Sequence, residues 1–227
     1  MKILIATIKS WNIQNAYRFK EKYENDIETT VISDKEHLNF DRIREINPEY
    51  IFFPHWSWTI PEKIHENYEC ILFHMTDLPF GRGGSPLQNL IEKEIENTKI
   101  SAFRVCEKLD AGNIYLKEDL NLNGSAEEIY MRASDIIFKK MIPKIIFEKP
   151  VPITQTGEPV EFKRRKAFQS EILPEFKLNK IYDYIRMLDA EGYPRAFIRF
   201  GDYKLAFSRA SMKNGRIVAD VEISMEV

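Results

Sequence analysis

The 227 residues are enough to bury one substantial hydrophobic core with a small appendix, but hardly two full domains. With 44% hydrophobic and 30% charged residues, the composition excludes a disordered or low-complexity chain. The formal net charge of −2 gives no general attraction to nucleic acid or to an anionic membrane, so we expect neither partner.

The cysteines and the N-terminal sequence bear on the compartment. Cys70 and Cys106 are too few for a disulfide framework, and no potential ligands lie at the spacing of a metal site. The first apolar run passes directly into charged sequence, which makes it too short for a signal peptide. No run approaches the length of a membrane-spanning helix. We therefore expect a cytoplasmic protein without a metal.

Strand and helix patterns alternate through the first two thirds of the chain. Ser125 and Glu128 have the spacing of a capping box at the start of the last helix. Such alternation predicts an α/β fold, a mainly parallel twisted sheet wrapped by helices, with ligands beyond the carboxyl ends of the strands. We predict strands at 2–8, 29–33, 50–54, 70–75, 99–105 and 113–122, and helices at 12–23, 38–46, 61–68, 85–96 and 125–147.

The Pro-containing run 149–152 interrupts the helical pattern and predicts a linker. We therefore expect a catalytic domain over residues 1–150 and a small α+β domain over 151–227, with a helix followed by antiparallel strands. Asn214 and Gly215 suit the turn between the last two strands. Exposed strands of this appendix would offer a pairing surface, so we also expect a homodimer.

Two elements contain side chains suited to chemistry. His74 ends a buried strand, and an imidazole titrates near neutrality, as proton transfer requires. The glycines after it permit close approach of the backbone to a ligand. Asp110 lies in an Asp-Ala-Gly turn between two strands. Taken singly, each has a structural alternative: a core histidine, and a turn in which the carboxylate caps its own backbone.

Together the two elements resemble the formyltransferase family. The histidine at the strand end is followed by Pro79, Arg82-Gly83 and Pro86 in the family's spacing, and then by the turn Leu109-Asp110-Ala111-Gly112-Asn113-Ile114. The resemblance covers residues 45–150 and implies a Rossmann-like fold and use of 10-formyltetrahydrofolate. It also implies that His74 and Asp110 are catalytic. His74 would take the proton of the attacking amine or stabilise the oxyanion, and Asp110 would orient the ring.

One position departs from the family. Its asparagine two residues before the histidine is Leu72 here, so an amide donor to the developing oxyanion is missing. The candidate replacements are Thr76, Gln88, Asn89 and the backbone N–H groups of 83–85. Without a replacement, a non-catalytic folate- or nucleotide-binding module is the alternative.

The resemblance also implies where the ligands bind. Two of the proposed binding residues, Trp56 and Trp58, could stack on a pterin or could instead fill the core. The basic run 163–166 is either a solvated edge or a phosphate contact. The expected folate-binding residues are His55, Trp56, Ser57, Trp58, Thr59, Arg82, Gly83, Gly84, Cys106, Glu107 and Lys108. The expected acceptor-binding residues are Ser10, Trp11, Asn12, Thr76, Asp77 and Arg164.

The acceptor is predicted from the appendix and the net charge. Residues 181–197 resemble a segment of the sugar N-formyltransferases, although they equally form an amphipathic helix with an apolar face. The methionyl-tRNA enzymes of the family are longer and more basic. We therefore expect formyl transfer to a nucleotide-linked amino sugar, such as a UDP- or dTDP-4-amino-dideoxy sugar. A minimal methionyl-tRNA formyltransferase is the alternative.

Overall fold

The computed structural model describes residues 1–225; the last two residues of the expected second domain lie outside it. The chain divides into two compact units. The first consists of Met1–Gly83, Thr98–Leu120 and Met131–Glu161. The second consists of Gly84–Asn97, Asn121–Tyr130 and Phe162–Val227. Both units therefore draw on sequence from before and after residue 150.

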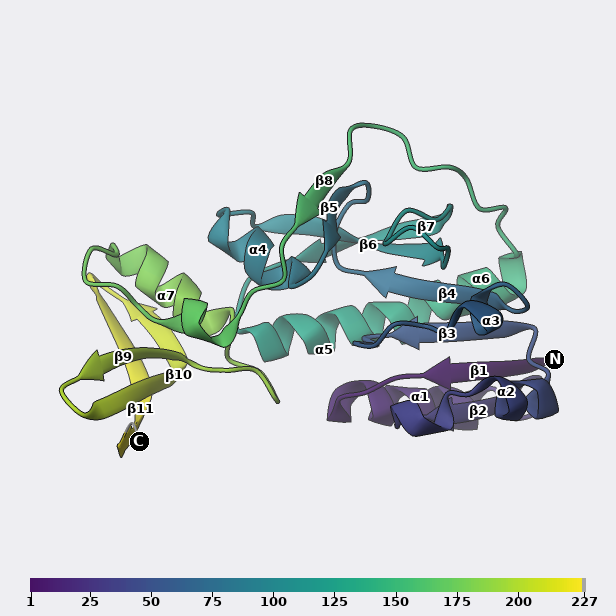
Figure 1. Ribbon diagram of the computed structural model, residues 1–227, viewed down its shortest axis with the longest axis horizontal. Helices are drawn as coiled ribbons and strands as arrows, with labels where there is room; N and C mark the ends of the chain where they lie inside the picture. Colours follow the sequence, from purple (N-terminus) through teal and green to yellow (C-terminus); the bar gives the residue numbers. More distant parts are fainter. Residues whose placement is uncertain (226–227) are drawn as a thin grey trace. The chain divides into compact units, whose positions relative to one another are not determined.

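The first unit is built on a six-stranded sheet in the order β2-β1-β3-β4-β6-β7 (Figure 1). β1, β2, β3 and β4 are parallel to one another, whereas β6 runs antiparallel to β4. The predicted α/β fold with a mainly parallel sheet is confirmed. The strands are β1 (Lys2–Ala6), β2 (Glu28–Ile32), β3 (Tyr50–Pro54), β4 (Glu69–His74), β6 (Asn97–Arg104) and β7 (Ile114–Asn121).

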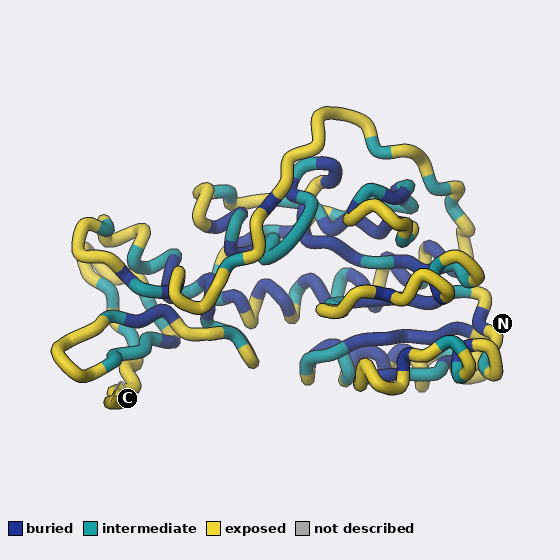
Figure 2. Tube along the Cα trace, viewed as in Figure 1, coloured by how far each residue is buried: buried dark blue, intermediate teal, exposed yellow. Residues whose placement is uncertain are grey.

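The central strands of this sheet are buried on both faces, as Figure 2 shows. Ile5 in β1 and Phe52 and Phe53 in β3 have no exposed surface, although successive side chains point to opposite faces. This explains why their sequences are continuous apolar runs rather than alternating ones. The helical segments that lie wholly or partly in the first unit are α1 (Ser10–Lys22), η1 (Lys35–His37), α2 (Phe40–Ile46), α3 (Glu62–His65), α5 (Ala126–Ile136), η2 (Ile137–Met141) and α6 (Ile142–Glu148).

The capping box at the start of α5 is present. The backbone N–H of Ser125 donates to Glu128 Oε2 at 2.8 Å, and the N–H of Glu128 donates to Ser125 Oγ at 3.3 Å. The single long helix predicted from here is instead interrupted by the π-helical segment η2. Pro143 follows it, and proline has no N–H and would clash with the preceding turn of a regular α-helix.

The second unit contains a three-stranded antiparallel sheet in the order β11-β10-β9. The predicted hairpin is confirmed: Lys213 pairs with Arg216, and Gly215 has a φ of 71° in the turn between them. The strands are β9 (Ala196–Phe200), β10 (Tyr203–Lys213) and β11 (Arg216–Met225). The helices are α4 (Pro86–Glu92), η3 (Ala167–Ser170) and α7 (Leu178–Arg186).

Backbone hydrogen bonds hold the segment after α6 against the first unit. Ile153 forms an antiparallel bridge with Ile114, with N–O distances of 2.7 and 2.9 Å. Further on, β8 (Val160–Phe162) pairs with β5 (Phe80–Gly83), which the Gly-rich sequence did not predict as a strand. The pairing supplies hydrogen-bond partners that neither short segment has alone. Across residues 1–225, no helix combines the length and the apolar character needed to cross a bilayer.

Candidate active site

His74 lies at the carboxyl end of β4 with 7% of its surface exposed. Its Nε2 is 2.7 Å from the carbonyl oxygen of Gly81 in β5. A carbonyl oxygen can only accept a hydrogen bond, so Nε2 carries its hydrogen and donates. This leaves Nδ1 as the nitrogen that can accept a proton.

Asp110 faces that nitrogen from the turn between β6 and β7. Its Oδ2 is 3.8 Å from His74 Nδ1 and accepts a hydrogen bond of 2.8 Å from the backbone N–H of Gly83. Its side chain is 8% exposed. The turn requires the glycine of its motif: a Cβ on Gly112 would lie 1.7 Å from the carbonyl oxygen of Arg104. The Asp-Ala-Gly sequence therefore has a structural reason as well as a chemical one.

The two side chains predicted to be catalytic are thus brought together. β5 connects them, because the carbonyl of Gly81 accepts from His74 and the N–H of Gly83 donates to Asp110. The carboxylate lies where it would stabilise a positive charge on the imidazole ring. Such an arrangement can accept a proton from a nucleophile bound beside Nδ1.

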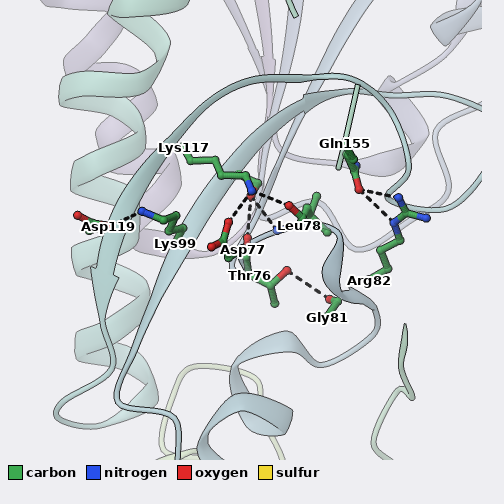
Figure 3. A network of polar contacts seen from close by, with 10 residues as sticks. Thr76, Asp77, Leu78, Gly81, Arg82, Lys99, Lys117, Asp119 and Gln155 are labelled. Atoms are coloured by element: carbon green, nitrogen blue, oxygen red, sulfur yellow. Dashed lines mark hydrogen bonds and ion pairs between the residues drawn. The ribbon is translucent and has the colours of Figure 1, made fainter. Parts of the chain in front are cut away.

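Arg82 lies between those two glycines, and its partner was not predicted. Its Nε and Nη2 donate to Gln155 Oε1 at 3.2 and 2.6 Å (Figure 3). Gln155 Nε2 in turn donates to the carbonyl oxygens of Asp110 and Gly112, each at 2.9 Å. Nothing local marks Gln155, because it lies in an irregular stretch 45 residues after Asp110.

Thr76 and Asp77, predicted to bind the acceptor, follow His74 directly. Thr76 is fully buried, and its hydroxyl donates to the Gly81 carbonyl at 3.4 Å. Asp77 is exposed and pairs with Lys117 of β7 (Figure 3). The Ser101 hydroxyl donates to the carbonyl of Thr76 at 2.7 Å and so anchors the segment to β6.

Leu72 is half-buried and packs against Leu78, Phe103 and Ile114 beside the site. Most candidate replacements for the missing amide are engaged elsewhere. The N–H of Gly83 donates to Asp110, and the N–H of Gly84 donates to the carbonyl of Phe162. The side-chain amides of Gln88 and Asn89 donate to groups within the second unit. Thr76 is the candidate beside His74.

The loop after β3 holds the predicted pterin-binding residues. Trp56 packs against the core beside Phe53, and its ring meets that of Trp58 edge to face with centroids 4.9 Å apart. Trp58 is 41% exposed, and Ser57 and Thr59 are also exposed. His55 has a φ of 56°. One tryptophan is therefore largely a core residue, and the other offers a surface.

The residues predicted at the mouth of the first strand are mostly turned inward. Trp11 is 6% exposed and its ring lies 6.2 Å from that of His55, while Asn12 is 2% exposed and donates to the carbonyl of Ile8. Ser10 is exposed. An open hollow lies at the amino ends of β1 and β2, the opposite end of the sheet from His74, and is lined by Met1, Lys2, residues 24–28, Asn47 and Glu49.

The remaining predicted residues lie in separate places. Cys106, Glu107 and Lys108 form an exposed approach to the Asp110 turn. Gly84 and Arg164 belong to the second unit, where a Cβ on Gly84 would lie 2.5 Å from Arg164 Cβ, so that glycine has a packing reason. In the part of the chain that the structure describes, no group of three or more His, Cys, Asp and Glu side chains could hold a metal.

Known proteins resemble this chain over different spans. A family model described as the C-terminal domain of methionyl-tRNA formyltransferase matches residues 167–224. A methionyl-tRNA formyltransferase from Bacillus mycoides is 29% identical over 163 residues, which are 68% of this chain and 52% of that protein. The chain thus spans about half the length of the curated relatives that it matches. A sugar N-formyltransferase from Shewanella is 16% identical, with a TM-score of 0.67, over 100% of this chain and 98% of that one.

The expectation of a nucleotide-linked amino sugar as acceptor, without nucleic acid as a partner, is wrong. A solved structure of methionyl-tRNA formyltransferase from Clostridium thermocellum is 62% identical over 100% of both chains, with a TM-score of 0.99. The sugar enzyme shares only the fold at its level of identity. The net charge of the whole chain was a poor guide to nucleic-acid binding, because it averages over regions of different charge. From Lys163 to Arg216, Lys and Arg residues clearly outnumber Asp and Glu residues.

The family follows from this full-length similarity and agrees with the geometry. His74, the Arg82-Gly83 segment and the Asp110 turn occur in the predicted order and meet at one place. With 62% identity over the whole of both chains, the protein belongs to the formyltransferase family.

Proposed function

We propose that the chain transfers a formyl group from 10-formyltetrahydrofolate to the amino group of methionyl-tRNA. The observation that carries this proposal is the 62% identity with the Clostridium thermocellum enzyme over the whole of both chains. Charged tRNA is made and used in the cytoplasm, so we propose that location as well.

His74 and Asp110 are assigned the proton transfer. A C–N bond forms between the amine and the formyl carbon, the C–N bond to the folate breaks, and the proton lost by the amine must reach the departing nitrogen. Nδ1 of His74 is suited to take that proton, because Nε2 already donates to Gly81. The carboxylate 3.8 Å away would stabilise the imidazolium until the proton is passed on.

Thr76 is our candidate for stabilising the developing oxyanion. Its hydroxyl is buried beside His74 and makes only a long contact of 3.4 Å with Gly81, so it can turn to a better acceptor. One hydroxyl replaces an amide imperfectly. Loss of a single oxyanion donor typically costs about 10²–10³ in rate, so we expect a slow enzyme.

The loop after β3 fits a folate. The indole N–H of Trp56 is buried without an acceptor among the described residues, and such a donor is normally satisfied in a protein. A pterin has ring nitrogens and a carbonyl that could accept from it, and the exposed ring of Trp58 could stack on a flat heterocycle. These residues would bind and orient the co-substrate that supplies the formyl group.

The basic run supports a tRNA acceptor. Lys163, Arg164 and Lys166 are exposed, whereas Arg165 pairs with Glu92. Exposed Lys and Arg side chains bind phosphates through counterion release, which makes the affinity depend steeply on salt. Of the two alternatives for this run, we therefore favour the phosphate contact.

The test is formylation of methionyl-tRNA. The protein is incubated with 10-formyltetrahydrofolate and methionyl-tRNA, the ester is hydrolysed, and formylmethionine is measured by chromatography. We expect formylmethionine from the charged tRNA, and none from free methionine under the same conditions. Binding to the tRNA should weaken as salt is raised. Absence of product with saturating co-substrate would contradict the proposal.

Leu72→Asn separates a slow enzyme from a binding module. If the wild-type protein is slow because an amide is missing, the variant should form product faster at unchanged tRNA affinity. A wild-type protein that binds tetrahydrofolate without transfer, and that becomes active only with this change, would be a binding module. Leu72→Ala is the control, since it removes the same packing against Phe103 without adding a donor.

A further inference from the structure

We propose that Gln155 is a positioning residue for the active site: its carboxamide holds the turn that carries Asp110. The role rests on the proposed function, because it acts on the carboxylate that faces His74. Neither the sequence motifs nor the family resemblance involves this residue.

The first half of the contact is made to the turn itself. Nε2 of Gln155 donates to the carbonyl oxygens of Asp110 and Gly112, both at 2.9 Å. These two carbonyls flank Ala111, so one amide group spans the turn from end to end. Asp110 has a φ of 49°, in the left-handed region that is sterically unfavourable for a residue with a Cβ. A turn with such strain keeps its shape when surrounding contacts fix it.

The second half of the contact orients the amide. Oε1 of Gln155 accepts from Nε and Nη2 of Arg82, at 3.2 and 2.6 Å. Arg82 can only donate and the two carbonyls can only accept, so a single orientation of the amide satisfies both sides. Figure 3 shows the guanidinium directed at this oxygen. Hydrogen bonds from a charged donor are stronger than those between neutral groups.

The contacts form a closed ring that joins β5 to the Asp110 turn. Arg82 lies between Gly81, which accepts from His74, and Gly83, which donates to Asp110. Gln155 therefore joins the side chain of one residue of β5 to the backbone of the Asp110 turn. The bridge between Ile153 and Ile114 fixes the chain two residues before Gln155. The segment after α6 thereby becomes part of the site's framework.

This arrangement gives Gln155 an effect on the rate of transfer rather than on the binding of tRNA. If the Asp110 turn relaxes, its carboxylate moves relative to His74 Nδ1, which is already 3.8 Å away. Small displacements of a group that acts in the transition state lower kcat strongly. Arg164, which is proposed to contact tRNA, makes none of these bonds with Gln155; Arg82, expected among the folate-binding residues, does.

Two substitutions test the role. Gln155→Ala removes every contact, and Gln155→Glu keeps an acceptor for Arg82 but replaces the donor to the two carbonyls by an oxygen. We expect both to lower kcat by about tenfold to 100-fold with KM for methionyl-tRNA within twofold of wild type. Thr156→Ala, an exposed neighbour in the same segment, is the control and should behave as wild type. A Glu variant as fast as wild type would overturn the proposal.

A second readout does not depend on turnover. The chain has four histidines, and the ring ¹⁵N signals of His74 can be assigned by their loss in His74→Asn. We expect Gln155→Ala and Gln155→Glu to shift these signals and Thr156→Ala to leave them in place. Unchanged signals in both Gln155 variants would contradict the positioning role. If instead the wild-type protein fails to formylate methionyl-tRNA, the proposed function is wrong, and the His74 signals still decide the role of Gln155.

Discussion

The two larger sheets of this protein differ in how far their faces are buried. In the first unit, β1 and β3 are buried on both faces, and the side chains of Ile5 and Phe53 have no exposed surface. In the second unit, Phe200, Ile223 and Met225 are 71%, 65% and 69% exposed, although all three are large apolar residues. They lie on one face of the sheet, because Phe200 pairs with Tyr203 and Tyr203 with Met225.

The buried sheet can hold a site rigidly, whereas the exposed sheet leaves an apolar face available to a partner. A sheet covered on both faces holds the ends of its strands firmly, and the candidate active site is at such an end, where β4 stops at His74. An apolar face left open to water is typical of a surface that meets a partner. The same chain thus contains one sheet suited to position a reaction and another suited to assembly.

We expect the largest effect on activity from a substitution at the end of β4. His74→Asn should lower kcat for formyl transfer by about 10²–10⁴-fold, because asparagine cannot take the proton. The thermal unfolding midpoint should change little, since the new amide can still donate to Gly81. His37→Asn, at an exposed position, is the matched control. Activity retained in the His74 variant would remove this residue from the mechanism.

Truncation of one phenylalanine in each sheet compares their contributions to stability. Phe53→Ala should lower the free energy of unfolding by about 3–5 kcal/mol, because a fully buried ring leaves a cavity. Phe200→Ala should change it by no more than about 0.5 kcal/mol, because the ring is already in water. Chemical denaturation measures both. Equal losses would mean that the face of β9 is covered in solution.

If the predicted homodimer forms through the apolar face of β9, β10 and β11, that face is buried in solution. Ile223→Lys would place a charge in the apolar surface and should raise the dissociation constant of a dimer by tenfold or more. Sedimentation velocity over a range of concentrations measures it, with Arg216→Ala at the other end of β11 as a comparison. A wild-type protein that stays monomeric at high concentration would refute the dimer.

The smallest expected effect is on the reactivity of the Cys70 thiol, which lies in β4 of the buried six-stranded sheet. Burial, with a smaller contribution from Glu69, raises the pKa of its thiol to about 12. The thiolate is the reactive form, so Cys70 should resist a thiol reagent at pH 8 while the exposed Cys106 reacts. Because the folded pKa is raised, the contribution to stability is complete below the unfolded pKa near 9 and is lost as the pH rises toward 12. Labelling of both thiols in the native protein would contradict this.

Much of the fold could be predicted from local patterns. The apolar run Tyr50–Pro54 is β3 at the predicted residues, and the Asn214-Gly215 turn joins β10 to β11. These elements are local, because a continuous apolar run, a capping box or a turn dipeptide acts through neighbours in the sequence. The antiparallel direction of β6 and the pairing of β5 with β8 depend on distant segments and were not predicted.

The site shows the same division. Residue types and spacing are enough to predict that His74 ends a strand and that Asp110 lies in a tight turn. The packing of distant segments is what brings Nδ1 of His74 to Asp110, Leu72 to Phe103, and Gln155 between Arg82 and the turn. The physical reason is that hydrogen bonds between residues far apart in the chain depend on how the strands are placed, which no local pattern encodes.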